Sequence, residues 1–268
     1  MTIVGGLLVV SLYFFGNTIP PQTPINELLK EERVDMENTF DINLWIDSLA
    51  NGLPVIQKDS LNLLVSEKQQ TFSLSTLSEL SAFWKNNRKP SLVAHFTELA
   101  ANQQAADIDK WVSAGEQYYI ANRLTKSVEA KQYFGDKAVA TLSKALELEP
   151  ENNTAQIALA STFIDAKNSV MQGVTLLKQV EQRDSNNLEV NLILGRLSMV
   201  SQQYDKVVTR MKKVRQLDSS NTEALYYLGE ANIALGNKKE GIQYLKSCIE
   251  LSENPAFKAE LEQYIKKL

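Results

Sequence analysis

Residues in the second half of the chain recur at a spacing of 34 positions. Leu194-Gly195 aligns in this way with Leu228-Gly229, and Asp184-Ser-Asn aligns with Asp218-Ser-Ser. Each period contains two stretches with the apolar spacing of amphipathic helices. Helix pairs of this size bury their apolar faces only by stacking on their neighbours, which produces a solenoid. The period therefore predicts an all-α second half made of stacked helix pairs.

The composition also favours helices. The 268 residues include 11 Gly and 7 Pro, about 4% and 3% of the chain, against averages of about 7% and 5% in proteins. Three of these prolines and three of the glycines lie at or before Pro24. The rest of the chain has few helix breakers, so we expect a mostly helical body and no turn-rich β fold.

The repeated positions resemble the tetratricopeptide repeat family. Its first helix carries a large residue and then a small pair that allows close packing, and its second helix carries small and apolar residues before Pro or Asp at the exit. The earliest repeat here has Trp111, Ala114-Gly115 and Tyr118, followed by Ala138, Leu142, Ala145 and Leu148-Glu-Pro150. The resemblance implies a right-handed helix-turn-helix solenoid.

The resemblance covers residues 108–255 and divides them into four repeats, of which the last three span 154–187, 188–221 and 222–255. In the first repeat, the interval from Tyr118 to Ala138 is about twice the interval that the family has there. This difference predicts an insertion that lengthens the helix pair around residues 122–134. Asn191 and Leu225 stand where Trp is usual, a degeneracy that leaves the fold prediction unchanged.

Helices are also expected on both sides of the repeats. Residues 25–107 look helical but irregular, and within them two apolar stripes flank the turn Asn86-Asn-Arg-Lys-Pro90, which predicts a helical hairpin at 76–103. Residues 256–268 carry one apolar stripe, made of Phe257, Leu261, Tyr264, Ile265 and Leu268. We expect a capping helix there, with one face on the last repeat and the other in water.

The N-terminus is apolar and carries no charged side chain from Ile3 to Ile19. The length of this run is the lower limit for spanning the hydrocarbon layer of a membrane. We therefore expect a transmembrane anchor at 1–19 and a Pro-rich linker at 20–24. The alternatives are a cleaved signal peptide, for which neither a basic start nor a small-residue cleavage site is visible, and a buried helix.

The orientation of this anchor is weakly determined by the sequence. Lys30 and Arg33 follow the span, which favours a cytoplasmic body by the positive-inside rule. Single N-terminal anchors in bacteria, however, commonly hold their body outside. We expect an anchor in a bacterial inner membrane with the soluble body in the periplasm, and the cytoplasmic orientation stays open.

The residues needed for chemistry are scarce. Cys248 is the single cysteine and His95 the single histidine, so the chain lacks material for a disulfide, a thiolate cluster or a His-based acid and base pair. No phosphate loop, zinc-protease, nucleophile-elbow or calcium-loop pattern is present. The net charge of -4 argues against nucleic acid as the main partner. We predict no enzymatic activity, no cofactor and no metal site.

The resemblance implies a binding groove on the concave face, lined by the first helix of each repeat. The groove residues predicted from the period are Glu116, Tyr119, Thr162, Asp165, Arg196, Met199, Tyr226 and Glu230. The Lys and Asn residues with which the family clamps a C-terminal carboxylate are missing, because those places hold residues such as Val112, Ala158, Leu192 and Glu116. Tyr and Met are common at binding surfaces, although each of these residues could instead pack between repeats.

Two classes of function fit these observations. The first is a membrane-anchored scaffold or adaptor that binds a protein or peptide, as an accessory subunit of a cell-envelope assembly. The second is a self-associating structural protein that uses the helices at 25–104, a hypothesis motivated by Trp45 and Trp84 outside the repeats. A chaperone-like role in secretion or cytochrome maturation is a further alternative that rests on the resemblance alone.

Overall fold

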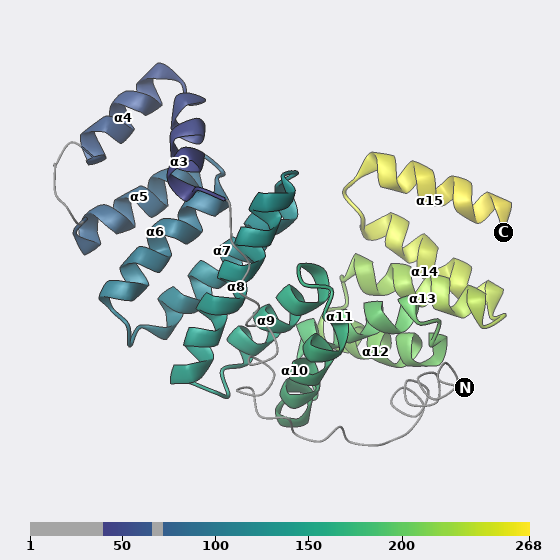
Figure 1. Cartoon of the computed structure of the whole chain (residues 1–268). Coiled ribbons are helices and arrows are strands. Elements are labelled where there is room, and N and C mark those ends of the chain that lie inside the picture. The colour runs from purple at the N-terminus through teal and green to yellow at the C-terminus, as the bar shows by residue number, and fades with distance from the viewer. Residues whose placement is uncertain (1–39, 66–71) are drawn as a thin grey trace, which may run out of the picture. The chain divides into compact units, whose positions relative to one another are not determined.

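The computed structural model describes residues 40–65 and 72–268 (Figure 1). Within these ranges the chain forms thirteen helices and no strand. The helices are α3 Ile42–Asn51, α4 Val55–Val65, α5 Leu74–Asn86, α6 Pro90–Gln103, α7 Ile108–Leu124, α8 Val128–Leu148, α9 Asn153–Asp165, α10 Val170–Arg183, α11 Leu188–Val200, α12 Tyr204–Leu217, α13 Thr222–Ala234, α14 Lys238–Leu251 and α15 Pro255–Lys267. The prediction of an all-α, repeat-built fold is confirmed for this part of the chain.

The predicted anchor at 1–19 and the linker at 20–24 lie outside the described residues. In the part of the chain that the structure covers, none of the helices combines the length and the apolar character needed to cross a membrane.

The chain divides into two compact units, and the division falls after Gln179, within α10. We call the residues up to Gln179 the N-terminal unit and Val180–Leu268 the C-terminal unit. Neighbouring helices pair in the order of the sequence in both units, as α7 does with α8 and α13 with α14. This pairing is what a stack of helical hairpins requires.

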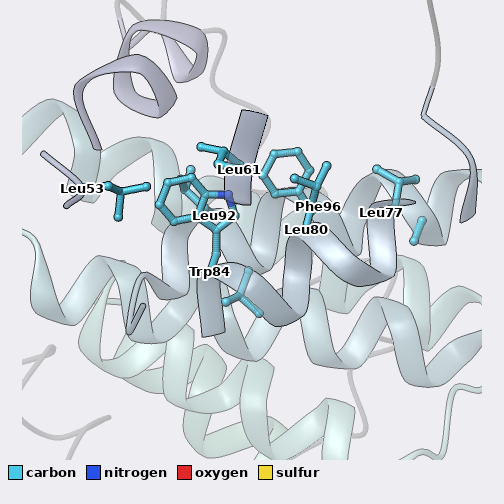
Figure 2. Packing of buried hydrophobic residues seen from close by; sticks show 9 residues of the cluster. Leu53, Leu61, Leu77, Leu80, Trp84, Leu92 and Phe96 are labelled. Carbon is cyan, nitrogen blue, oxygen red and sulfur yellow. The ribbon is translucent and has the colours of Figure 1, made fainter. Parts of the chain in front are cut away.

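The core of the N-terminal unit begins with α4, α5 and α6. Figure 2 shows the buried residues that pack together there, namely Leu53, Leu61, Leu77, Leu80, Trp84, Leu92 and Phe96. Trp84 has no exposed surface. Trp45 of α3 packs against the same cluster and donates its indole N–H to Ser91 Oγ at 3.1 Å. Of the two tryptophans that motivated the self-association hypothesis, Trp84 is thus a core residue, and Trp45 is partly buried against the same core.

The α7–α8 hairpin, where the sequence predicts an insertion, is made of long helices. These helices have 17 and 21 residues, whereas α9 and α11 have 13 each. Asn122 is buried in this hairpin and donates from Nδ2 to the carbonyl oxygen of Lys131 at 2.6 Å. Phe134 stacks on Tyr118, with ring centroids 6.1 Å apart. Both helices are therefore longer than α9 and α11, and a partly buried hydrogen bond joins them near their connecting loop.

A capping motif recurs where one repeat passes into the next. Asn152, Asn187 and Asn221 each cap a first helix by accepting a hydrogen bond from the backbone N–H three residues later. Each asparagine also donates from Nδ2 to the carboxylate three residues before it, at 2.9 Å to Glu149, 3.2 Å to Asp184 and 3.1 Å to Asp218. These contacts give a physical reason for the alignment of Asp184 with Asp218.

Small residues let the two helices of a repeat approach closely. A Cβ atom added at Gly195 would lie 2.0 Å from Met211 Cε, and one added at Gly229 would lie 2.4 Å from Leu245 Cδ2. Both distances are far below van der Waals contact. The Leu-Gly pairs that recur with the period are therefore the points at which a first helix touches the second helix of its own repeat.

Candidate partner-binding surface

Two of the predicted groove residues of the N-terminal unit meet between α7 and α9. Tyr119 is half-buried and donates its hydroxyl to Asp165 Oδ2 at 2.5 Å. The guanidinium carbon of Arg123 lies 5.7 Å from the centre of the Tyr119 ring. Glu116 is half-buried one turn earlier on α7. The structure thus brings together two of the four residues predicted for this unit, Tyr119 and Asp165.

The environment of Tyr119 keeps its hydroxyl protonated. Burial raises the pKa of Tyr119 to about 12, and the hydrogen bond to Asp165 acts in the same direction. An open pocket of about 650 Å³ adjoins this pair, and its charged lining residues are Arg123, Lys131, Asp165 and Lys167. Lys167 Nζ is 2.6 Å from Asp136 Oδ1. The pocket therefore has both signs of charge and favours no single class of ligand.

Thr162 does not belong to an exposed surface. It has no exposed area, and its hydroxyl donates to the carbonyl oxygen of Ala158 at 2.9 Å. Its short side chain stays within the packed layer between helices, where a partner cannot reach it. The placement of Thr162 in the groove is therefore corrected to a core position.

In the C-terminal unit, Arg196 and Met199 of α11 have different environments. Arg196 is exposed, and its Nε lies 3.1 Å from Glu223 Oε1 on α13. Met199 is half-buried and packs against the cluster that contains Val207, Met211 and Leu228. Arg196 can thus contact a partner, whereas Met199 mainly packs between repeats, which was the alternative interpretation.

Tyr226 and Glu230 of α13 line a pocket of about 240 Å³ together with residues of α15. Figure 1 shows α15 beside the last hairpin. We call this cavity the α13–α15 pocket. Its lining residues are Tyr226, Glu230, Phe257, Glu260, Leu261 and Tyr264. The groove prediction missed the contribution of α15, although Tyr264 lies one full period after Glu230 and so continues the same series of positions.

Glu230 has an unusual environment in this pocket. Its Oε2 accepts a hydrogen bond from the Tyr264 hydroxyl at 3.3 Å. Its Oε1 is buried and has no hydrogen-bond partner among the described residues. Burial raises the pKa of Glu230, and the Tyr264 hydrogen bond offsets this only in part. A half-buried carboxylate with one unpaired oxygen is costly unless a donor is supplied from outside.

Potential metal ligands lie apart from one another in the described part of the chain. Within residues 40–65 and 72–268, no three His, Cys, Asp or Glu side chains come together in a way that could hold a metal ion. His95 is half-buried on α6 beside Phe96, with ring centroids 5.2 Å apart, and burial lowers its pKa.

Comparison with known proteins defines the class of fold. Residues 222–255, which contain α13 and α14, match the model of the tetratricopeptide repeat family. This is the range that the sequence period assigns to the last repeat. No curated protein sequence matches the chain.

Two solved structures have a similar fold. One is a MamA chain from Desulfovibrio magneticus RS-1, which is 17% identical, with a TM-score of 0.52 over 66% of this chain and 94% of that chain. The other is YrrB, described as a TPR protein with an unusual peptide-binding site, which is 16% identical, with a TM-score of 0.50 over 73% of this chain and 90% of that chain. At these identities the likeness concerns the fold alone.

Proposed function

We propose that this chain is a non-enzymatic scaffold or adaptor that binds a protein or peptide segment through the first helices of its repeats. The observation that carries the proposal is the surface of the C-terminal unit. There, Arg196, Tyr226 and Glu230 occupy equivalent or neighbouring positions of consecutive repeats and remain at least partly exposed. Aromatic and arginine side chains on a rigid helical surface are typical of binding hot spots.

The fold supports this proposal. Within each unit, stacked helix pairs place successive first helices beside one another, so a partner segment can bind with little ordering of the scaffold. The similarity to YrrB, whose description includes a peptide-binding site, supports a peptide or protein as the class of partner.

The membrane association of the scaffold belongs to the same proposal. The uncharged run from Ile3 to Ile19 is long enough to act as an anchor in a bacterial inner membrane, with the soluble body in the periplasm as part of a cell-envelope assembly. Tethering raises the local concentration of the scaffold near a membrane-bound partner without new contacts. Protease digestion of right-side-out and of inverted inner-membrane vesicles tests this orientation. A periplasmic C-terminal unit should be digested in right-side-out vesicles and protected in inverted ones.

The binding surface is tested by capture of partners from a detergent extract. The intact chain is compared with a variant that carries Arg196→Ala, Tyr226→Ala and Glu230→Ala. Loss of most captured protein in this variant is the expected result, because hot-spot truncations cost about 1 kcal/mol or more each. We call the surface formed by the first helices of the repeats, which includes Arg196, Tyr226 and Glu230, the first-helix surface. Equal recovery by both chains would show that this surface is not the binding site.

A matched control changes exposed residues on the second helices of the same unit. The control variant carries Gln216→Ala, Lys246→Ala and Glu250→Ala, which lie on α12 and α14 and are all exposed. It should capture the same proteins as the intact chain. Both variants should show the helical circular dichroism and the cooperative melting of the intact chain, so that a loss of capture reports on the surface and not on folding.

Self-association through the helices before the repeats is a second candidate function. It is suggested by exposed apolar side chains on α4. Ile56 and Leu63 are 80% and 77% exposed, and they are seven residues apart, so they share a face of the helix. Light scattering of the chain in detergent, with and without Ile56→Glu and Leu63→Glu, tests this candidate. A monomer in both samples would dismiss it.

A further inference from the structure

The α13–α15 pocket is chemically distinct from the rest of the first-helix surface. Three of its six lining side chains are aromatic, namely Tyr226, Phe257 and Tyr264. Two others, Glu230 and Glu260, are carboxylates. Among the described residues, no Lys, Arg or His lines the pocket and neither carboxylate forms an ion pair. The pocket therefore carries uncompensated negative charge beside aromatic rings.

This combination favours a cation. The face of an aromatic ring attracts an ammonium or guanidinium group, and the attraction is stronger where water is excluded. Tyr226 and Phe257 lie with ring centroids 6.2 Å apart on neighbouring helices, so a group between α13 and α15 meets both. Carboxylates that accept hydrogen bonds from such a cation add the stronger, charge-assisted contacts.

Glu230 adds an independent observation. Its Oε1 is buried without a hydrogen-bond partner among the described residues, while Tyr264 satisfies only Oε2. Buried polar atoms in native proteins almost always have partners, so an exception calls for a ligand or a functional role. After a rotation of the Glu230 carboxylate, an incoming N–H donor would satisfy this oxygen, whereas an anion or an apolar group would not.

The size of the pocket limits what can enter. Its volume of about 240 Å³ is below the range of about 300–1,000 Å³ that is usual for sites of drug-sized molecules. It suits one extended side chain with a charged end. Because Tyr226 and Glu230 also belong to the predicted binding surface, a partner segment that lies along the first helices would pass the mouth of the pocket.

We propose that the α13–α15 pocket receives the ammonium or guanidinium end of a lysine or arginine side chain from the bound partner segment. This inference rests on the proposed scaffold function and specifies the chemistry of its partner. Glu230 and Glu260 bind the charge, and the rings of Tyr226, Phe257 and Tyr264 surround the carbon chain and the cationic end.

The test uses small probes and the full chain in dodecyl maltoside, since detergents with choline headgroups would compete for the same site. The probes are butylammonium and butylguanidinium chloride, and the controls are sodium butyrate and butanol at constant ionic strength. The readout is the ¹⁹F spectrum of the chain labelled with 3-fluorotyrosine, in which Tyr226→Phe and Tyr264→Phe identify the two resonances. Both cations should shift these resonances saturably, and the controls should not.

Variants assign the binding to the pocket. Glu230→Gln keeps the shape of the side chain and should weaken cation binding at least tenfold, and Glu260→Gln should weaken it less. The matched control is Glu223→Gln, which removes a carboxylate of the same helix that pairs with Arg196 outside the pocket. Equal shifts with butanol, or equal cation affinity in Glu230→Gln and the intact chain, would overturn the proposal.

The two proposals can fail separately. If the intact chain captures partners through Arg196 and Tyr226 while butylammonium does not bind, the cation pocket is wrong and the scaffold function stands. If butylammonium binds in a Glu230-dependent way while the triple-alanine variant of the first-helix surface captures the same proteins as the intact chain, the scaffold surface is wrong. If Glu230→Gln fails to melt cooperatively, Glu260→Gln alone decides the pocket.

Discussion

The environment of Glu230 lowers the stability of the fold but suits a residue that binds a ligand. It lies half-buried between α13 and α15, where one oxygen accepts from Tyr264 and the other has no partner among the described residues. The aromatic neighbours reduce its exposure to water, and among the described residues they provide one hydrogen bond. A carboxylate kept in such a place costs free energy of folding, which agrees with a role in binding.

The pH dependence of stability follows from this environment. Burial raises the pKa of Glu230 above its ordinary value of 4.5, so the folded chain holds this proton more tightly than the unfolded chain does. Stability contributed by Glu230 must therefore fall as the pH rises from the ordinary pKa through the raised one. Glu230→Gln should lack this decline and should be as stable as the intact chain, or more stable by less than about 1 kcal/mol, at neutral pH.

Urea unfolding of both chains at several pH values between 4 and 8 measures this effect. The variant keeps the neighbouring titratable residues, which are Glu260, Tyr226 and Tyr264. The difference between the two curves of unfolding free energy against pH therefore reports on Glu230. Parallel curves over the whole range would contradict the prediction.

Gly241 and Gly195 permit a matched comparison of close packing. A Cβ at Gly241 would lie 2.7 Å from the carbonyl oxygen of Gly229, a backbone atom that cannot move away easily. A Cβ at Gly195 would meet Met211 Cε, the end of a flexible side chain. Gly241→Ala should lower the free energy of unfolding by about 1–3 kcal/mol, and Gly195→Ala should change it by less than about 1 kcal/mol. Urea denaturation would decide, and equal losses would refute this explanation.

At the scale of the helix, the repeated asparagine caps fix where each first helix begins. Asn187 accepts a hydrogen bond from the Val190 N–H at 3.1 Å and donates to Asp184 at 3.2 Å. Asn187→Ala removes both contacts and should destabilise the C-terminal unit by about 1 kcal/mol. Thermal unfolding measures the effect. Asn186→Ala, a change of the same type at the preceding exposed residue, should have little effect, and a similar loss in both variants would show that the cap is not the cause.

The helices and their pairing were predictable from the sequence because the information is periodic. Leu-Gly pairs, apolar stripes and acidic residues before the caps recur at 34 positions, and each recurrence reflects a local contact such as Gly229 with Leu245. Local contacts of this kind repeat with the chain, so a shift of the sequence against itself reveals them.

The burial of each predicted groove residue was not predictable from the period. Thr162, Arg196 and Glu230 stand at equivalent positions of three repeats, yet Thr162 is buried, Arg196 is exposed and Glu230 is half-buried. The difference arises from side-chain length and from neighbours outside the repeat. A short threonine bonds its own helix at Ala158, a long arginine reaches Glu223, and α15 covers Glu230 with Tyr264. Periodicity does not contain this information.

At the scale of the whole molecule, α15 protects the end of the C-terminal unit. Leu261 is its buried residue and packs against a cluster that contains Leu225, Leu245 and Cys248. Cys248, the single cysteine of the chain, is fully buried and donates from Sγ to the Thr222 carbonyl oxygen at 3.3 Å. Burial also raises the pKa of this thiol. The rate at which a reagent modifies this thiol should therefore show whether α15 is packed against the last repeat.

Leu261→Ala should weaken the packing of α15 by about 2–5 kcal/mol. Because every 1.4 kcal/mol is tenfold in an equilibrium constant, modification of Cys248 by a thiol reagent should become more than about tenfold faster. Lys258→Ala, on the same helix but outside the buried cluster, is the control and should react at the rate of the intact chain. An unchanged rate in Leu261→Ala would mean that the thiol becomes accessible by a route other than release of α15.

The capping motif has a consequence for how such a chain can evolve. Each asparagine and its carboxylate partner lie in one short loop, so the capping contacts between two repeats are encoded within a few codons. Duplication or loss of one genetic unit would carry these contacts with it. A lineage can thus gain or drop a repeat, and with it a stretch of recognition surface, without having to invent a new connection.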